Sequence, residues 1–460
     1  MIDIAASTMA NIGPAMSFFF GFSFLAVTAG VASPLTIVAA GIAIALLGNT
    51  LAQFSRAQPS AGGFITFVGK SFGPTSAVTT ALLAGLGYII AMAAVIAISG
   101  GFLQITASRY LGWDVPWIVW SLLLTALSVV MMVRGIGVST KLAGLFFGVE
   151  MIVLVAVSIV AIVKHGNALS IAPFLPSHIT GGVKGLAEGF PLAIYLFIGW
   201  ENSAALAEET DNPRRNVGRA VFSSVAIMAV SYILFAYATV TGFGYDVDKL
   251  SASPIPFIAV ARGSLGVLAF TAYLAGLTST MGALIAGTNS QARLLFSAGR
   301  EGLLPSFIGR VHPTRRTPTN AIFTFVAIAL LIIGGWGLGH ILGGHPTMDP
   351  ISFFAEASTM GTILVMLVYL TSNIALPFYY RKYRPQEFSV LKHLVLPALG
   401  ALAIIVPLYY LAKPGQPAPY SWFPYVAFAL VAASILYAVV LTRRDPELGD
   451  RVGSLIADAE

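Results

Sequence analysis

The pattern of apolar and polar positions divides the chain into long hydrophobic runs joined by short polar connections. A helix needs about 20 apolar residues to cross roughly 30 Å of hydrocarbon, because each residue adds ~1.5 Å. Runs of this length predict an all-α membrane protein with about twelve transmembrane helices and no sizeable soluble domain. The helices are expected near residues 4–31, 34–55, 75–107, 115–133, 139–163, 184–209, 217–243, 264–297, 319–339, 351–378, 393–411 and 421–442.

The predicted helix over 184–209 is interrupted at its middle. Gly199 and the acid Glu201 flank Trp200 there, at the depth of the bilayer centre. Unpaired backbone groups cost several kcal/mol in hydrocarbon, so such a break is stable only where it lines a cavity. Helix N-termini at a break attract anions, and unwound carbonyls bind cations. The break therefore predicts a ligand site.

A comparable interruption at Gly13-Pro14 lies within the first predicted helix. Residues 1–165 and 184–378 each contain five predicted helices, so each half begins with an interrupted helix, as internal repeats of transporters do. An odd number of helices per half inverts the second repeat relative to the first. Two further helices, 11 and 12, occupy residues 393–442, and residues 443–460 form a cytoplasmic tail.

Composition supports the membrane assignment and excludes several kinds of chemistry. The 460 residues are 57% hydrophobic and 10% charged, whereas soluble domains carry roughly 25% charged residues. There is no cysteine, which excludes disulfides, thiol nucleophiles and thiolate metal sites. The six histidines are scattered without the spacing of a helical metal site. Neither a cofactor nor the nucleophile-and-base cluster of a membrane enzyme is therefore expected.

Positive charge is distributed unevenly over the connections. With the N-terminus inside, 19 of the 25 Lys and Arg residues fall on cytoplasmic connections and six on outer ones. This asymmetry predicts a multi-pass protein of the plasma (inner) membrane with both termini in the cytoplasm. The charges are spread over six connections, so a nucleic-acid partner is not expected. The expected partners are the lipid bilayer and a small-molecule substrate; the sequence predicts no oligomeric state.

Two acids within predicted helices are candidate functional groups. Glu201 follows the break directly, where it either caps the freed amides of the next half-helix or holds a proton or a substrate ammonium. Glu150 lies well inside the fifth predicted helix, where an acid costs about 3 kcal/mol on insertion scales. We therefore favour an ion-coupling role for Glu150 over a purely structural one. The acids Glu208, Glu209 and Asp211, with the following arginines, form instead a solvated cluster at the membrane boundary.

Hydroxyl and aromatic side chains give weaker signals. Thr278 and Ser279 lie in mid-helix beside Ala275, and such hydroxyls usually bond to their own helix. Together with a free carbonyl they could instead supply oxygen ligands to a small cation such as Na⁺. Near the second break, Tyr195, Phe197 and Trp200 either pack within the protein or cover a bound ligand.

Three stretches of the chain resemble the amino acid–polyamine–organocation (APC) superfamily of transporters. The resemblance rests on Pro59-Ser60-Ala61-Gly62-Gly63 with Phe72-Gly73-Pro74, on Phe197-Ile198-Gly199-Trp200-Glu201 with Asn212-Pro213-Arg214-Arg215, and on Arg300-Glu301-Gly302-Leu303-Leu304-Pro305 with Thr317-Pro318-Thr319-Asn320-Ala321. It runs through nearly all twelve predicted helices. It implies the leucine-transporter (LeuT) type of fold, with 5+5 inverted repeats plus two C-terminal helices, and secondary transport by alternating access.

The resemblance also implies a substrate site at the two breaks. Carried over by position, this site combines Ile12, Gly13, Ala15, Tyr195, Phe197, Ile198, Gly199 and Glu201. Tyr195 occupies the position of an aromatic gate, and Glu201 that of a proton-sensing acid in some antiporters. Sodium-coupled carriers of this fold have a Thr-Ser pair that resembles Thr278-Ser279.

Two positions depart from the family pattern. The first break commonly reads Gly-Ser-Gly, but here Pro14 replaces the serine and offers no N–H to a substrate carboxylate. This leaves an α-amino acid and an amine or polyamine as alternative substrates. Many sodium-independent relatives have a lysine where this chain has Glu150, so H⁺ and Na⁺ both stay open as the coupling ion. We expect a secondary active importer by symport, with an exchanger as the alternative. Neither a channel, which needs a continuous polar pore, nor an enzyme is expected.

Overall fold

The computed structural model describes residues 2–134, 136–207, 210–344 and 348–451. Within these ranges all regular structure is helical. Ten segments of the described chain are long and apolar enough to cross a membrane, which confirms an all-α membrane protein. Two of them, Ile4–Ala57 and Pro256–Arg300, contain more than one α-helix. Of the acids predicted at the membrane boundary, Glu208 and Glu209 lie outside the described residues.

The first predicted helix is divided into α1 (Ile2–Ile12) and α2 (Pro14–Ala29). Gly13 separates them with a φ of 62°, a left-handed conformation that glycine adopts without strain. Pro14 then begins α2, where its fixed φ suits the first helical position and its missing N–H costs nothing. The interruption predicted from Gly13-Pro14 is therefore confirmed.

The predicted helix over 184–209 is likewise divided. It forms α8 (Gly182–Tyr195) and α9 (Asn202–Ala205), joined by turns over residues 196–201. Gly199 has a φ of 108°, and a Cβ atom added there would lie 3.0 Å from the amide nitrogen of Asn11. Only glycine fits this close approach of the two breaks.

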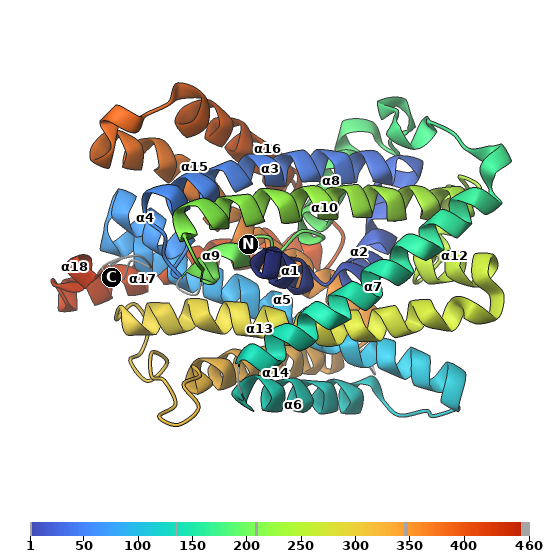
Figure 1. The fold of residues 1–460 in the computed structure, drawn as a ribbon, viewed down its shortest axis with the longest axis horizontal. Helices are drawn as coiled ribbons and strands as arrows, with labels where there is room; N and C mark the ends of the chain where they lie inside the picture. The colour runs from blue at the N-terminus through green and yellow to red at the C-terminus, as the bar shows by residue number, and fades with distance from the viewer. Residues whose placement is uncertain (1, 135, 208–209, 345–347, 452–460) are drawn as a thin grey trace.

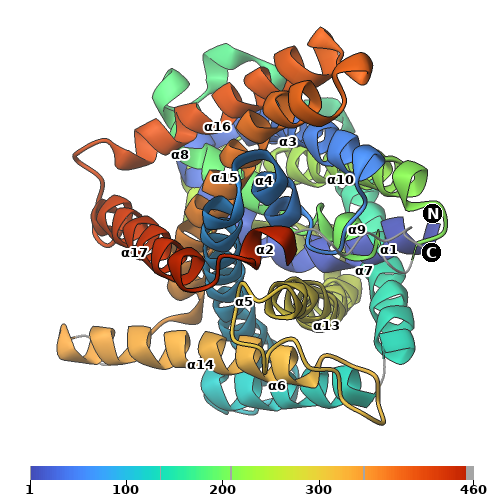
Figure 2. The ribbon, with the colours of Figure 1, turned by 90° about the vertical axis from the view of Figure 1, so that its left-hand side faces the viewer.

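Long helices surround the two broken ones. α5 (Pro74–Leu111), α13 (Phe270–Arg300) and α15 (Pro350–Tyr383) pack together on one side, and α3 (Ser33–Ala57) packs against α10 (Pro213–Gly242) on another. Figure 2, which looks along the bundle, shows α2 near the centre of these helices. The broken helices therefore lie in the protein interior.

The remaining helices form the periphery. α7 (Ile136–Lys164) crosses α13, and α6 (Trp117–Arg134) with α14 (Thr319–Leu342) covers α5. α16 (Leu396–Ala412) and α17 (Phe423–Arg444) lie against α15 at the outside of the bundle. Large apolar side chains on these helices are exposed, such as Leu436, which is 67% exposed. They fit a surface that faces lipid.

Short helices lie at the two ends of the bundle. α4 (Phe64–Phe72) and α18 (Leu448–Arg451) lie at the left end in Figure 1, where α3 and α15 end and α10 begins. α11 (Val247–Ala252) and α12 (Pro256–Leu265) connect α10 to α13. We call the end that carries Arg56, Arg214 and Arg384 the arginine-rich end.

Candidate functional site

The two helix breaks meet each other inside the bundle. The side-chain amide of Asn11, at the end of α1, donates a hydrogen bond to the carbonyl of Gly199 over 3.3 Å. One turn away, the hydroxyls of Thr8 and Ser203 lie 2.8 Å apart and hydrogen-bond. Buried polar groups need such partners. These contacts join residues 188 and 195 positions apart and bring the two breaks into one site.

A small cavity lies where the breaks face α5 and α13. Its volume is about 40 Å³, which holds two or three water molecules. Its lining residues come from five helices and the 196–201 turns: Asn11, Ile12, Met16, Ser17, Tyr88, Ala91, Met92, Val95, Tyr195, Ile198, Gly199, Ala283, Gly287 and Gln291. The lining is mostly apolar, and none of these residues carries a formal charge. We call this the central cavity.

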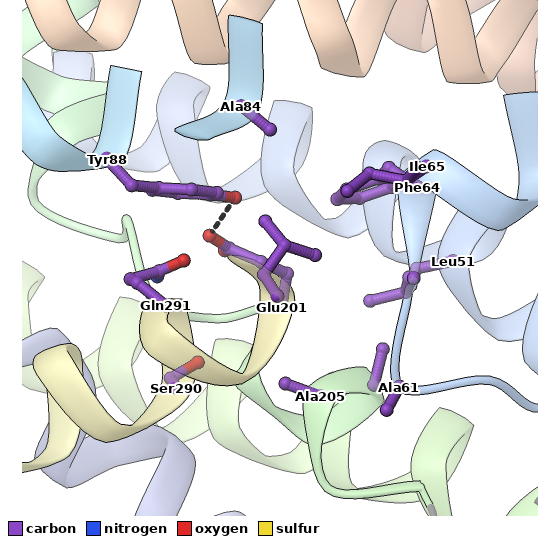
Figure 3. Close-up of a pocket in the computed structure, with 13 residues that line it drawn as sticks. Leu51, Ala61, Phe64, Ile65, Ala84, Tyr88, Glu201, Ala205, Ser290 and Gln291 are labelled. Atoms are coloured by element: carbon purple, nitrogen blue, oxygen red, sulfur yellow. Dashed lines mark hydrogen bonds between the residues drawn. The ribbon is translucent and has the colours of Figure 1, made fainter. Parts of the chain in front are cut away.

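A second cavity, of about 30 Å³, lies on the side of the arginine-rich end (Figure 3). Residues Leu51, Ala61, Gly63, Phe64, Ile65, Ala84, Tyr88, Glu201, Ala204, Ala205, Ser290, Gln291 and Leu294 line it. Tyr88 and Gln291 line both cavities, so these two side chains separate them. We call this second space the gate cavity.

A short hydrogen bond positions Tyr88 between the two cavities. The hydroxyl of Tyr88 on α5 donates to Oε1 of Glu201 over 2.6 Å, as Figure 3 shows. The other carboxylate oxygen accepts from the backbone amide of Gly199 over 3.2 Å. Behind them, the indole of Trp200 donates to the hydroxyl of Tyr369 over 3.1 Å. Glu201 therefore caps a freed amide of the break and also ties the break to α5.

The amides at the start of α2 are already bonded within the protein. The N–H of Ala15 donates to Oε2 of Glu150 over 3.1 Å, and that of Met16 donates to the hydroxyl of Ser279 over 3.0 Å. Glu150 is only 1% exposed. A carboxylate at a helix N-terminus is stabilised by the helix dipole. Glu150 thus caps the N-terminus of α2, which is a structural role that its sequence position did not reveal.

The predicted site residues are not all brought to the central cavity. Ile12, Tyr195, Ile198 and Gly199 line it. The others lie around it. Gly13 and Ala15 form the bend and start of α2, and Glu201 lines the gate cavity. Phe197 faces away and packs edge-on against Tyr232, with ring centroids 5.4 Å apart.

The predicted cation ligands on α13 are divided between two environments. Ser279 is buried and faces the start of α2. Thr278 is partly exposed, and its hydroxyl donates to the carbonyls of Leu274 and Ala275 in its own helix, over 3.1 and 3.0 Å. Helix-internal bonding is the usual behaviour of such hydroxyls. The carbonyl of Ala275 already accepts from Thr278 as well.

Sequence reasoning did not assign Asn11, Tyr88 and Gln291 to the site. Each is a polar side chain inside an apolar helix, which is the signal that singled out Glu150. Applying that argument to amides and phenols would have found all three. Met92, Ala283 and Gly287 give no such signal, because an apolar residue in a membrane helix is ordinary.

The fold and the site define a class of protein. Apolar membrane-crossing helices enclose a small cavity where two broken helices meet, an arrangement suited to holding a small ligand inside the membrane. Residues 3–442 match the sequence model of the family described as "Amino acid permease", and the chain belongs to that family. The resemblance to the APC superfamily is therefore confirmed.

Individual relatives agree with the family assignment. The chain is 28% identical over 320 residues to an uncharacterized amino acid permease, YecA, of Bacillus subtilis, covering 69% of this chain and 73% of the relative. It is 26% identical over 345 residues to the branched-chain amino acid permease BcaP of Lactococcus lactis, covering 73% and 67%. It is 24% identical over 431 residues to the methylthioribose transporter of B. subtilis, covering 89% and 86%. The family and these relatives confirm a multi-pass transporter of small molecules rather than an enzyme.

Proposed function

We propose that the protein is a secondary active transporter that imports a neutral, apolar amino acid by alternating access. The observation that carries this proposal is the central cavity, where two broken helices meet around an uncharged, largely apolar lining. The branched-chain amino acid permease among the relatives supports this substrate class. A polyamine would need carboxylates around it, and the described lining residues include none.

A second candidate substrate is a neutral polar molecule without a carboxylate. The methylthioribose transporter covers more of this chain than the other two relatives do. The amides of Ala15 and Met16, which could bind a substrate carboxylate, are already bonded to Glu150 and Ser279. Pro14 supplies none. A ligand that needs no carboxylate site would leave these bonds unchanged.

We propose H⁺ rather than Na⁺ as the coupling ion, with Glu150 as its carrier. A substrate carboxylate and the Glu150 carboxylate would compete for the same N-terminus of α2, and two like charges cannot both be stabilised there. Protonation of Glu150 would remove one charge and weaken its bond to the amide of Ala15. Proton and substrate would then enter together. The helix-internal bond of Thr278 gives the Na⁺ alternative less support.

The proposed fold has twelve crossings in two inverted repeats, with α1–α2 and α8–α9 as the broken first helix of each. Residues 1–165 and 184–378 are the repeats, 393–442 holds helices 11 and 12, and 443–460 is the cytoplasmic tail. The positions of the two breaks support this repeat. The arginine-rich end supports a cytoplasmic side that includes both termini, in the plasma membrane. Rocking of one helix group against the other would switch access.

Uptake into proteoliposomes tests the proposal. The purified chain is reconstituted, and uptake of radiolabelled leucine, valine, methylthioribose and putrescine is measured under a pH gradient and, separately, under a Na⁺ gradient. We expect leucine or valine uptake that an inward H⁺ gradient increases and a Na⁺ gradient does not. Uptake of putrescine alone, or of any substrate under Na⁺ alone, would contradict the proposal.

A further inference from the structure

An open pocket of about 1040 Å³ lies at the arginine-rich end, separate from the central and gate cavities. It is formed by the end of α3, the first three turns of α10 and the chain that follows α15. Its lining consists of Ala52, Gln53, Arg56, Arg214, Arg215, Gly218, Arg219, Phe222, Arg384 and Glu387. Figure 2 shows the ends of α3 and α10 side by side here. Five arginines therefore face one space together with one glutamate.

Among the described lining residues of this pocket, the arginines outnumber the acids by five to one. Glu387 pairs with Arg384 at 2.7 Å, which accounts for the one acid in the lining. Arg56, Arg215 and Arg219 are exposed, and among the residues that the structure describes their guanidinium groups have neither a hydrogen-bond nor an ion-pair partner. Guanidinium groups bind phosphate through paired N–H donors. The pocket therefore fits a phosphate-bearing anion.

The surface of α10 indicates which kind of molecule carries that phosphate. Arg215, Arg219, Phe222, Ala226 and Val230 follow one another at spacings of three or four residues, so they lie on one face of the helix. The face is basic at its start and apolar further along. Phe222 is 43% exposed and Val230 is 69% exposed. Such a face offers a phosphate site at the membrane surface and an acyl-chain surface immediately below it.

We propose that this pocket binds the phosphate headgroup of an anionic phospholipid, with Arg56, Arg215 and Arg219 as its ligands. The acyl chains would lie along Phe222, Ala226 and Val230. Clustered arginines beside membrane helices attract anionic headgroups, and the apolar continuation distinguishes a lipid from a soluble phosphate. This site is independent of the transport substrate, and its test does not require transport.

Native mass spectrometry of the detergent-purified full chain tests the proposal. The protein is titrated with a phosphatidylglycerol and, separately, with a phosphatidylcholine of the same acyl chains. We expect selective retention of the phosphatidylglycerol. Each arginine near a membrane surface contributes about a fivefold increase in affinity for an anionic lipid. The double variant R215Q/R219Q should therefore lose about 30-fold in phosphatidylglycerol affinity. Equal binding of the two lipids by the wild type would overturn the proposal.

A matched control separates this site from general positive charge. Arg443 and Arg444 are also exposed and adjacent, but they lie at the end of α17 outside the pocket. R443Q/R444Q should keep the wild-type affinity; an equal loss in both double variants would show that no specific site exists. Arg56→Gln, on a different helix, should lower the phosphatidylglycerol affinity about fivefold. It provides a second variant should R215Q/R219Q fail to fold.

Competition distinguishes the two sources of phosphate. Inorganic phosphate and glycerol 3-phosphate, at millimolar concentration, should leave bound phosphatidylglycerol in place. Phe222→Ser should weaken the lipid while keeping every arginine. Displacement of the lipid by either soluble anion, or full retention in F222S, would indicate a site for a soluble phosphate and overturn the lipid assignment.

Discussion

Glu150 on α7 accepts a hydrogen bond from the backbone amide of Ala15, 135 positions earlier, with its Oε2 atom 3.1 Å from the amide nitrogen. This contact places the buried acid at the N-terminus of α2, beside the break that shapes the central cavity. The bond explains how a carboxylate is tolerated at this depth, because the helix dipole and an amide donor both stabilise its charge. It also ties the protonation of Glu150 to the freedom of α2.

Glu150→Gln should flatten the pH dependence of uptake. Glutamine keeps the shape and can still accept from Ala15, but it has no charge and cannot release a proton. In the wild type, uptake should rise as the pH falls, since protonation weakens the bond to the amide. We expect uptake in the variant to fall to the rate measured without a pH gradient, because glutamine carries no proton. Exchange of internal for external substrate should persist.

The control for this prediction is Ser279→Ala, which removes the partner of the neighbouring amide, Met16. It should weaken uptake at every pH and keep a dependence on pH, because Glu150 can still bind a proton. A wild-type pH profile in Glu150→Gln would remove this residue as the proton carrier. A new requirement for Na⁺ in that variant would instead indicate that the space near Ser279 takes a cation.

Substitution of Gly199 should abolish uptake. Gly199 has a φ of 108°, and a Cβ there would lie 3.0–3.1 Å from atoms of Asn11. Gly199→Leu should therefore push the two breaks apart while α5, α13 and α15 stay folded.

Gly244→Ala is a matched control, because Gly244 also has a positive φ of 63° but has open space around it. It should cost about 1–2 kcal/mol of strain and keep uptake. Uptake by Gly199→Leu at the control's rate would place the substrate elsewhere.

The breaks could be predicted because the residues that make each break unfavourable are adjacent in the sequence. Gly13-Pro14 and Gly199 with Glu201 are expensive in any membrane helix, whatever lies next to them. The residues that complete the site could not be predicted in the same way. Whether Met92 on α5 or Ala283 on α13 faces the cavity depends on how each helix is rotated and tilted against its neighbours, which packing decides.

The hydrogen-bond partners of the buried acids could not be predicted from the sequence for a similar reason. Sequence placed Glu150 and Glu201 at membrane depth, but Ala15 and Tyr88 are 135 and 113 positions away from them. No local pattern links residues so far apart. Glu201 accepts from the amide of Gly199 within the break, and its side chain does not cap α9, the next half-helix. Its role toward a proton or an ammonium stays a prediction.

Asn11→Ala should reduce uptake by weakening the contact between the two breaks. The Asn11 amide donates to the Gly199 carbonyl over 3.3 Å inside the protein. Its loss leaves a buried carbonyl with one donor fewer, which costs about 1–3 kcal/mol. We expect a lower melting temperature and a several-fold lower uptake. Asn320→Ala removes a similar bond to the Phe307 carbonyl at an exposed position and should change neither quantity. Equal effects of the two variants would show that the Asn11 bond has no special role.

Tyr88→Phe should open the pathway from the central cavity toward the arginine-rich end. It removes the 2.6 Å bond to Glu201, while that carboxylate keeps its bond from the Gly199 amide. A hydrogen bond to a charged group contributes roughly 1.5–3 kcal/mol, so its loss should shift the population of the open state by about ten- to a hundredfold.

Cysteine labelling can measure this opening. The chain has no cysteine, so a single introduced cysteine is the only thiol that reacts. Ala61 lines the gate cavity and is 7% exposed, so Ala61→Cys reports whether that cavity opens. Labelling of this cysteine by a water-soluble maleimide should be faster in the Tyr88→Phe background by a similar factor, and substrate should slow it. Tyr383→Phe is the control, because Tyr383 also donates to a protein oxygen, the Lys70 carbonyl, but does so at the exposed surface. An unchanged labelling rate in Tyr88→Phe, or an equal rise in Tyr383→Phe, would mean that the bond between Tyr88 and Glu201 does not hold the gate closed.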